Sequence, residues 1–203
     1  MINIDREGAI QTIKINRPEK AGALTEDMLV DLRDAARAAH DAAALIVTGT
    51  GPVFSAGADL EQARAGLATS SLWEELSGAI ASLPGLTIAA LNGTVAGGAI
   101  GMVLACDLRI AVPSTKFFYP VMKLGYLPQP SDPIRMTALI GPARTKWLLL
   151  AGQKITAATA HAFGLIDEVV EHAALLDRAQ DLSRDVANAQ SETAREIKIL
   201  CKQ

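Results

Sequence analysis

The spacing of hydrophobic residues divides the chain into short strands and amphipathic helices. The segment 4–15 is predicted to be a hairpin, because isoleucines recur in a β-rich run and residues 6–8 supply a turn. Thr25 is followed by two acidic residues, which is typical of a helix N-cap, and the apolar stripe after it keeps helical spacing as far as His40. A hairpin followed by a helix is therefore expected at the amino-terminal end.

The middle of the chain repeats one order of elements. Apolar strands lead into glycine-rich stretches, and helices are predicted before Pro84 and over the apolar run 99–106. The recurring unit is strand, strand, helix. The predicted strands are 44–48, 87–91, 107–112 and 115–119.

The last third of the chain is predicted to be mostly helical. One helix is interrupted at Gly141-Pro142, and Thr156 can cap a short helix that Gly164 closes. The final two helices have polar faces, so they are expected on the surface or against another subunit. They span 173–189 and 192–201.

Length and composition narrow the class of protein. The 203 residues suffice for one domain with a substantial core, and 50% of them are hydrophobic. A formal charge of -3 argues against a nucleic-acid surface. Without a signal-peptide pattern or a membrane-length apolar run, a cytoplasmic protein with no membrane partner is expected.

Cys106 and Cys201 lack zinc or redox spacing, so no metal site is predicted, and Cys106 is interpreted as a buried, inert thiol.

Two glycine-rich segments carry most of the chemical information. They run from Phe54 to Leu60 and from Asn92 to Gly98, and each follows an apolar strand. A strand that opens through small residues into a helix leaves free backbone NH groups at the turn. Glycine also lets a bulky ligand approach the main chain. The pattern is suited to binding an oxyanion through backbone amides.

Together with residues 16–24 and 105–109, these segments resemble the enoyl-CoA hydratase/isomerase (crotonase) family. The likeness is collinear from about Ile4 to Val170. It implies an α/β, crotonase-like (ClpP/crotonase) spiral of repeated ββα units. The expected parts of this single domain are a core over 1–172 and a shortened carboxy-terminal helical region over 173–203.

The resemblance also implies a site and an assembly. By position, the backbone NH groups of Ala58 and Gly98 correspond to the oxyanion hole for the thioester carbonyl of an acyl-CoA. CoA is part of the substrate, and no separate cofactor is implied. A homotrimer or a dimer of trimers is expected from the family. The positions that correspond to CoA binding are Lys20, Ala21, Ala23, Ala56, Asp59 and Leu60.

Both acid/base carboxylates of a family hydratase are missing. Gly101 stands where hydratases carry the first glutamate, and Val121 stands where they carry the second. Gln129 occupies the position at which some dehalogenases and dienoyl isomerases have an aspartate. Because such groups typically contribute roughly 10²- to 10⁴-fold each, the sequence argues against ordinary hydration of a 2-enoyl-CoA.

Asp132 is the candidate replacement, because it is close to the region predicted to line the acyl pocket. An aspartate before proline at a helix start is also typical of an N-cap, and the pattern favours capping over catalysis. Tyr119 and Tyr126 flank the region and could donate a hydrogen bond, although packing is the commoner role. Glu74 and Glu75 are expected on a solvated helix face.

Two hypotheses of function follow. The first is an acyl-CoA enzyme of hydratase or isomerase type that stabilises a thioester enolate, which the intact oxyanion segments favour. The alternative is a non-catalytic acyl-CoA binding or assembly subunit, which the missing glutamates favour. A nucleotide-binding α/β domain is a third, weaker hypothesis. It would need a glycine where Phe54 stands and a helix directly after, but Pro52 and a further loop intervene.

Overall fold

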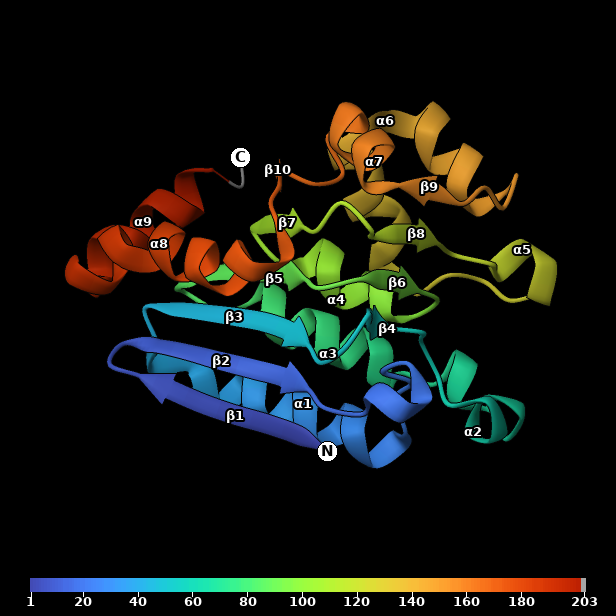
Figure 1. Ribbon diagram of the computed structural model, residues 1–203, viewed down its shortest axis with the longest axis horizontal. Helices are drawn as coiled ribbons and strands as arrows, with labels where there is room; N and C mark the ends of the chain where they lie inside the picture. The colour runs from blue at the N-terminus through green and yellow to red at the C-terminus, as the bar shows by residue number, and fades with distance from the viewer. Residues whose placement is uncertain (202–203) are drawn as a thin grey trace.

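Two β-sheets form the framework of the molecule, as the computed structural model, which describes residues 1–201, shows (Figure 1). β1 is antiparallel to β2 and β8 to β9, and the other neighbouring strands are parallel. The larger sheet has the order β1 (Ile2–Glu7), β2 (Ile10–Ile15), β3 (Ala44–Gly49), β5 (Leu86–Leu91), β7 (Leu108–Ala111) and β10 (Glu168–Val169). The smaller sheet has the order β4 (Val53–Ser55), β6 (Thr94–Ala96), β8 (Lys116–Phe118) and β9 (Ile155–Thr156).

Three strands of the larger sheet are each followed by a short strand of the second sheet and then by a helix. β3 leads to β4 and α2 (Leu60–Arg64), β5 leads to β6 and α4 (Ala99–Ala105), and β7 leads to β8 and α5 (Val121–Leu124). The predicted α/β fold of strand, strand, helix units is therefore confirmed. The hydrophobic pattern did not separate β4 and β6 from the glycine-rich segments, because a three-residue strand is too short to show alternation.

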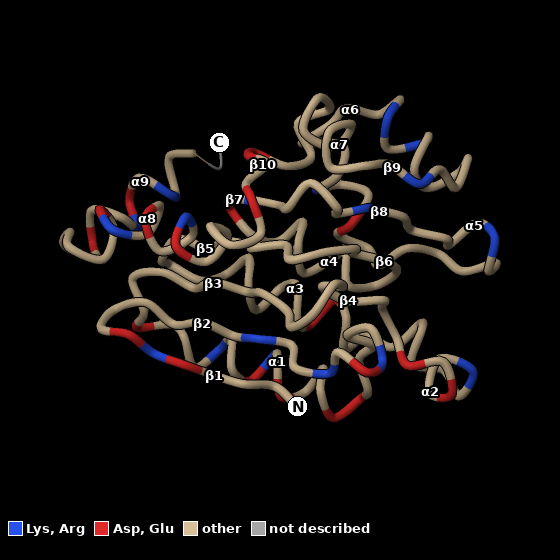
Figure 2. The backbone as a smooth tube through the Cα atoms, in the orientation of Figure 1, with Lys and Arg blue, Asp and Glu red and all other residues tan. Residues whose placement is uncertain are grey.

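Both faces of the six-stranded sheet are buried. Leu45 and Val47 belong to the main core, together with residues of α1 (Glu26–Ala38) and α3 (Leu72–Ala81), whereas Ile46 belongs to a smaller core that includes residues of α8 (Leu175–Asn188). This division follows from the two-residue period of a strand. Figure 2 shows charged residues distributed around the periphery of the molecule. β3 and β5 carry none, as expected for strands covered on both faces.

The predicted helix signals are also confirmed. The Thr25 hydroxyl accepts a hydrogen bond from the amide of Met28 at 3.3 Å, and the Thr156 hydroxyl caps its helix in the same way. Gly141 has a φ of 77°, which interrupts the helix there, and Gly164 ends a helix with a φ of 83°. The helices concerned are α1, α6 (Ser131–Leu149) and α7 (Ala157–Phe163).

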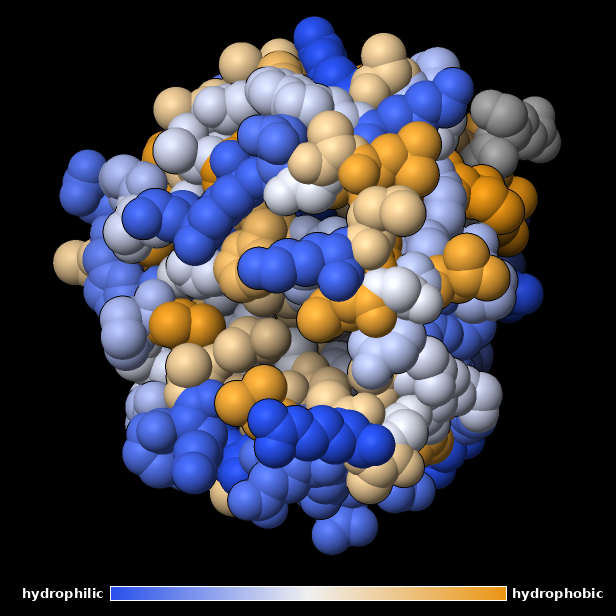
Figure 3. Space-filling model, turned by 90° about the vertical axis from the view of Figure 1, so that its right-hand side faces the viewer, coloured by the Kyte–Doolittle hydropathy of each residue, from blue (hydrophilic) through white to orange (hydrophobic). Residues whose placement is uncertain are grey.

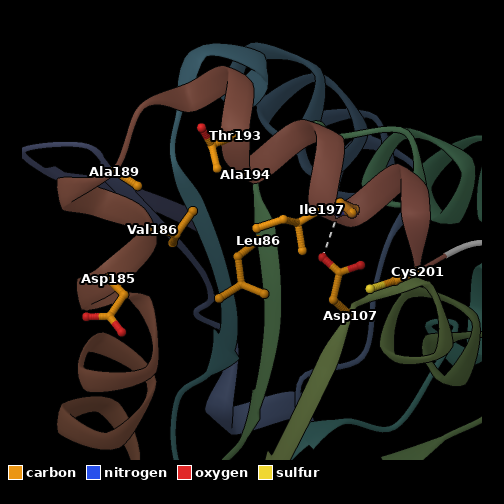
Figure 4. A pocket seen from close by; sticks show the side chains of 10 residues that line it. Leu86, Asp107, Asp185, Val186, Ala189, Thr193, Ala194, Ile197 and Cys201 are labelled. Atoms are coloured by element: carbon orange, nitrogen blue, oxygen red, sulfur yellow. Dashed lines mark hydrogen bonds and ion pairs between the residues drawn. The ribbon is translucent and has the colours of Figure 1, made fainter.

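The carboxy-terminal helices pack differently from each other. α8 contacts β2, β3, β5 and β7 of the larger sheet, whereas α9 (Ser191–Leu200) contains no fully buried residue. Below α9 lies a cavity of about 410 Å³, into which Leu86, Val186 and Ile197 converge (Figure 4). Lys198 and Asp107 also line it, and the Lys198 ammonium group donates to Asp107 Oδ2 at 2.6 Å.

Within the described part of the chain, no helix combines the length and the hydropathy needed to cross a bilayer. Residues 1–201 also contain no group of three His, Cys, Asp or Glu side chains placed to hold a metal ion.

Candidate active site

Two glycine-containing loops meet where β4 and β6 end. The strands are parallel neighbours, so the loops that follow them lie side by side. Gly57 has a φ of 91°, and a Cβ atom there would lie 2.9 Å from the carbonyl oxygen of Ala96 and 3.4 Å from the Cα atom of Gly97. Only glycine meets both conditions. The absence of a side chain at Gly57 therefore allows the two backbones to touch.

The amide of Ala58 is left free by the hydrogen bonds on either side of it. Leu24 donates from its amide to the carbonyl oxygen of Gly57 and accepts from the amide of Asp59, both at 2.8 Å. In such a parallel bridge the middle residue uses neither its own NH nor its own carbonyl group. The Ala58 NH donates to no other group in residues 1–201, so it is available to a ligand.

Gly98 holds the second free amide. Its φ of -60° is one that any residue adopts, so space rather than conformation requires glycine here. A Cβ atom would lie 2.7 Å from Cδ2 of Trp73. The Trp73 ring is itself fixed, because its Nε1 donates to the carbonyl oxygen of Leu67 at 2.8 Å. The Gly98 amide has no acceptor within the described chain.

Ala58 and Gly98 both line one cavity of about 430 Å³. Its walls come from α2 on one side, from α5 and the loop after it on the other, and from Trp73 and Tyr119 between them. Figure 3 shows the corresponding face of the molecule, which is hollowed near its centre. The two amides predicted from the sequence therefore line a common space large enough for a ligand.

The residues predicted to bind CoA fall into two groups. Ala56 and Leu60 line the cavity. Lys20, Ala21 and Ala23 lie beside it on the segment that follows β2, where the carbonyl oxygen of Ala21 accepts from the amide of Ala56 at 3.0 Å. Asp59 is the N-cap residue of α2. Gly22 lies directly on β4, since a Cβ atom there would be 2.5 Å from the carbonyl oxygen of Phe54. The structure thus brings both groups together, with Lys20, Ala21, Ala23 and Asp59 outside the cavity wall.

Asp59 has a structural explanation of its own. Its Oδ1 accepts from the amide of Glu61 at 3.1 Å, which caps α2. Its Oδ2 accepts from Arg17 at 2.9 Å, and the same Arg17 nitrogen donates to the carbonyl oxygen of Ala23. The Arg17 guanidinium group lowers the pKa of Asp59. The side chain therefore ties the segment after β2 to α2.

Asp132 does not cap α6, so the prediction of a capping role is wrong. The helix begins at Ser131 with no side-chain cap, and the Asp132 side chain points inward with an exposure of 0%. Its Oδ2 accepts a hydrogen bond from the Tyr119 hydroxyl at 2.8 Å. Its Oδ1 is buried and has no partner in residues 1–201. Burial raises the pKa of Asp132 to about 6, although the Tyr119 hydrogen bond acts in the opposite direction.

The space beside Gly101 is taken by this carboxylate. A Cβ atom on Gly101 would lie 2.7 Å from Asp132 Oδ1. Residues three apart share one face of a helix, so Gly101 and Gly98 face the same side of α4. The aspartate from α6 thus occupies the position that a side chain on residue 101 would need. This explains why residue 101 is glycine.

Other groups around the site correct or extend the sequence interpretation. Glu74, expected on a solvated face, instead accepts hydrogen bonds from both the amide and the hydroxyl of Ser131. Val121 is buried and lines the cavity with an apolar surface. Burial raises the pKa of Cys106 to about 12, in accord with an inert thiol. Arg64 also lines the cavity. It lies in the last turn of α2, and no pattern in the sequence singled it out.

Comparison with known proteins decides the family. Residues 5–202 match the family described as Enoyl-CoA hydratase/isomerase. The chain belongs to this family. A probable enoyl-CoA hydratase of Mycobacterium leprae is 32% identical over 97% of this chain and 79% of its own length. A crotonyl-CoA hydratase of Syntrophomonas wolfei is 32% identical over 90% of this chain and 74% of its own. A 1,2-epoxyphenylacetyl-CoA isomerase of Escherichia coli is 31% identical over 89% of this chain and 74% of its own length.

Solved structures agree with this assignment to the enoyl-CoA hydratase/isomerase family. The crystal structure of an enoyl-CoA hydratase from Bacillus anthracis superposes with a TM-score of 0.91 at 29% identity, covering 100% of this chain and 82% of that one. DspI of Pseudomonas aeruginosa gives a TM-score of 0.90 at 32% identity, and the match covers 99% of this chain and 86% of that one. The crotonase-like fold predicted from the sequence is confirmed.

Proposed function

We propose that this family member binds an acyl-CoA thioester and stabilises the enolate of its acyl group between the amides of Ala58 and Gly98. The observation that carries the proposal is the pair of free NH groups lining one cavity. Fixed backbone donors stabilise negative charge as it develops on the thioester oxygen, and they need no rearrangement during the reaction.

The acyl-CoA class of substrate is supported by the names of the relatives. A crotonyl-CoA hydratase and a 1,2-epoxyphenylacetyl-CoA isomerase both carry a CoA thioester in their names. We place the CoA moiety of the substrate along Ala56 and Leu60 at the cavity, along the adjacent segment that holds Lys20, Ala21 and Ala23, and beside Asp59 at the start of α2. Arg64 adds a positive charge at the cavity wall, which suits the phosphate groups of CoA.

Isomerase-type chemistry fits the site better than hydration. Hydration of an enoyl-CoA needs one group to activate water and one to protonate the α-carbon, and Gly101 and Val121 supply neither. Moving a proton within the acyl group needs only enolate stabilisation and a single base. A lyase or isomerase that proceeds through an enolate is therefore the proposed activity.

The test is exchange of the α-protons of butyryl-CoA for deuterium in D₂O, followed by mass spectrometry. Gly98→Pro removes one amide and Gly98→Ala keeps it, while both variants place a Cβ atom against Trp73. We expect exchange in Gly98→Pro to fall below that in Gly98→Ala by roughly 10²- to 10³-fold, as for the loss of one oxyanion-hole donor. Equal rates in the two folded variants would refute the oxyanion hole.

The alternative is a non-catalytic acyl-CoA binding or assembly subunit, favoured by the apolar Val121 in the cavity wall. Calorimetric titration with butyryl-CoA distinguishes the two. Binding without deuterium exchange in the wild-type protein would establish the subunit, whereas binding with exchange establishes the enzyme. Absence of binding to any acyl-CoA would refute both.

A further inference from the structure

We infer that Asp132 is the proton-transferring group of this site, with Oδ1 as the base and Tyr119 as the hydrogen-bond donor that positions it. The inference rests on the proposed function and adds the acid/base residue that the family positions Gly101 and Val121 do not provide.

The placement of the carboxylate is the first argument. Oδ1 lies against Gly101, one turn along α4 from the Gly98 amide. Neighbours three residues apart on a helix are separated by roughly 5–6 Å between their Cβ positions. Tyr119, which holds the other oxygen of Asp132, lines the cavity together with Gly98, so the carboxylate lies directly behind the cavity wall. We place the α-carbon of the bound acyl group at this part of the wall.

The unsatisfied oxygen is the second argument. A buried polar atom without a partner is costly, and such atoms are rare in folded proteins. Two buried side-chain atoms in residues 1–201 lack a partner, Asp132 Oδ1 and Thr50 Oγ1. One oxygen of Asp132 is held by Tyr119, which itself lines the cavity, and the other is left without a partner in residues 1–201. A carboxylate that is fixed on one side and free on the other is arranged to accept a proton.

The charges around Asp132 are few. α6 contributes Arg135, whose guanidinium group donates to the Ser77 hydroxyl at 2.9 Å and favours the ionised carboxylate. α3 contributes Glu74, which opposes ionisation, and the strand side contributes Tyr119, whose hydrogen bond favours it. α4 contributes no titratable residue over Ala99–Ala105. Burial outweighs the favourable contacts, so the carboxylate is a stronger base than an exposed aspartate.

The proton transfer is balanced within the acyl group. The α C–H bond breaks, an O–H bond forms at Oδ1, and the electron pair moves onto the thioester oxygen, which the two amides hold. The proton then returns to the same carbon, or to the γ-carbon when the substrate has a 3,4 double bond. No water, oxidant or second carboxylate is consumed, and the double bond moves without net change in oxidation state.

Two variants test the inference by deuterium exchange of butyryl-CoA and by the shift of the double bond in 3-hexenoyl-CoA. Asp132→Asn should reduce both rates by roughly 10²- to 10⁴-fold, the usual contribution of a positioned acid/base group, while leaving the binding of butyryl-CoA intact. Glu74→Gln removes the neighbouring carboxylate and should keep a rate close to that of the wild type. Circular dichroism checks that each variant is folded.

The pH profile of Tyr119→Phe separates positioning from packing. In the wild type the rate should rise with pH as Asp132 ionises, through a pKa of about 6. Loss of the Tyr119 hydrogen bond destabilises the ionised carboxylate, so the profile should move to higher pH. A purely structural tyrosine would lower the rate without moving the profile.

Each contrary result bears on a different part of the proposal. Wild-type rates in folded Asp132→Asn would overturn the inference and leave the oxyanion hole standing. A large loss in Glu74→Gln with none in Asp132→Asn would assign the proton transfer to Glu74 instead. No exchange in the wild-type protein would refute the proposed enzyme and the inference together.

Discussion

At the scale of single residues, the site depends on glycine positions at which there is no room for a side chain. The sequence predicts Ala58 and Gly98 as donors because of their place in the glycine-rich segments. It does not predict that Gly98 is required by the ring of Trp73, or that Gly101 is required by Asp132. Both contacts join elements that lie far apart in the chain, so they cannot be predicted from a local sequence pattern.

The contact between the two loops gives a prediction at Gly57. Gly57→Ala places a methyl group 2.9 Å from the carbonyl oxygen of Ala96 and should push the two amides apart, with a loss of about 10² in exchange rate for a displacement near 1 Å. Gly152→Ala is the matched control, since Gly152 has a φ of 62° and open space around it. Equal rates in the two variants would show that the close approach is unimportant.

The buried carboxylate predicts a pH-dependent stability. Asp132 has its pKa raised from 3.8 to about 6, so the folded state binds this proton more tightly than the unfolded state does. Stability therefore falls as pH rises between about 4 and 6, and the full cost, about 3 kcal/mol, is present above that range.

Asp132→Asn lacks this ionisation. The variant should gain thermal stability relative to the wild type at pH 8, and the gain should be smaller at pH 5. Differential scanning calorimetry at the two pH values measures the difference. A gain that does not vary with pH would contradict the burial of an ionised group.

At the scale of elements, long periodic segments are predictable and short ones are not. The capped helix after Thr25, the break at Gly141 and the helix between Thr156 and Gly164 all follow from local signals, because caps and glycines act within one turn. β4, β6 and α5 are three or four residues long and depend on neighbours from other units. Asp132 shows the same limit. Its sequence context resembles a helix N-cap, but its side chain instead lies against Gly101 of α4.

The docking of α9 gives a prediction at this scale. Lys198 donates to Asp107 at 2.6 Å and to the carbonyl oxygen of Gly85 at 2.7 Å. Lys198→Ala should weaken the attachment of α9 by about 1–3 kcal/mol, as for lost hydrogen bonds to a charged group. Hydrogen exchange should then speed up in α9 and not in α8. Arg195→Ala, on the exposed face of the same helix, should leave α9 protected.

At the scale of the whole molecule, the fold is the part best predicted. A collinear set of motifs fixes the order of the units, because each glycine-rich segment must follow its own strand. The division into a core over 1–172 and a shortened carboxy-terminal helical region over 173–203 stays a prediction. The position of α8 does not follow from the sequence, because its apolar stripe indicates only that some partner exists, and the structure places that partner in the larger sheet.

The assembly remains a prediction at this scale. We propose a trimer or a dimer of trimers, as expected for the family, with the exposed apolar residues Ile199 and Leu200 of α9 available for contacts between subunits. Light scattering coupled to size-exclusion chromatography at micromolar concentration measures the mass. A monomer under these conditions would refute the proposal.

The contact between Gly101 and Asp132 restricts how such a site can change over evolutionary time. A glutamate introduced at residue 101 would collide with the aspartate, and removal of the aspartate alone would leave this pocket with neither carboxylate. Each single step is therefore expected to lower fitness, and only the paired exchange leads from one arrangement to the other. Natural relatives should carry an acidic residue at one of these two positions or at the other, but not at both.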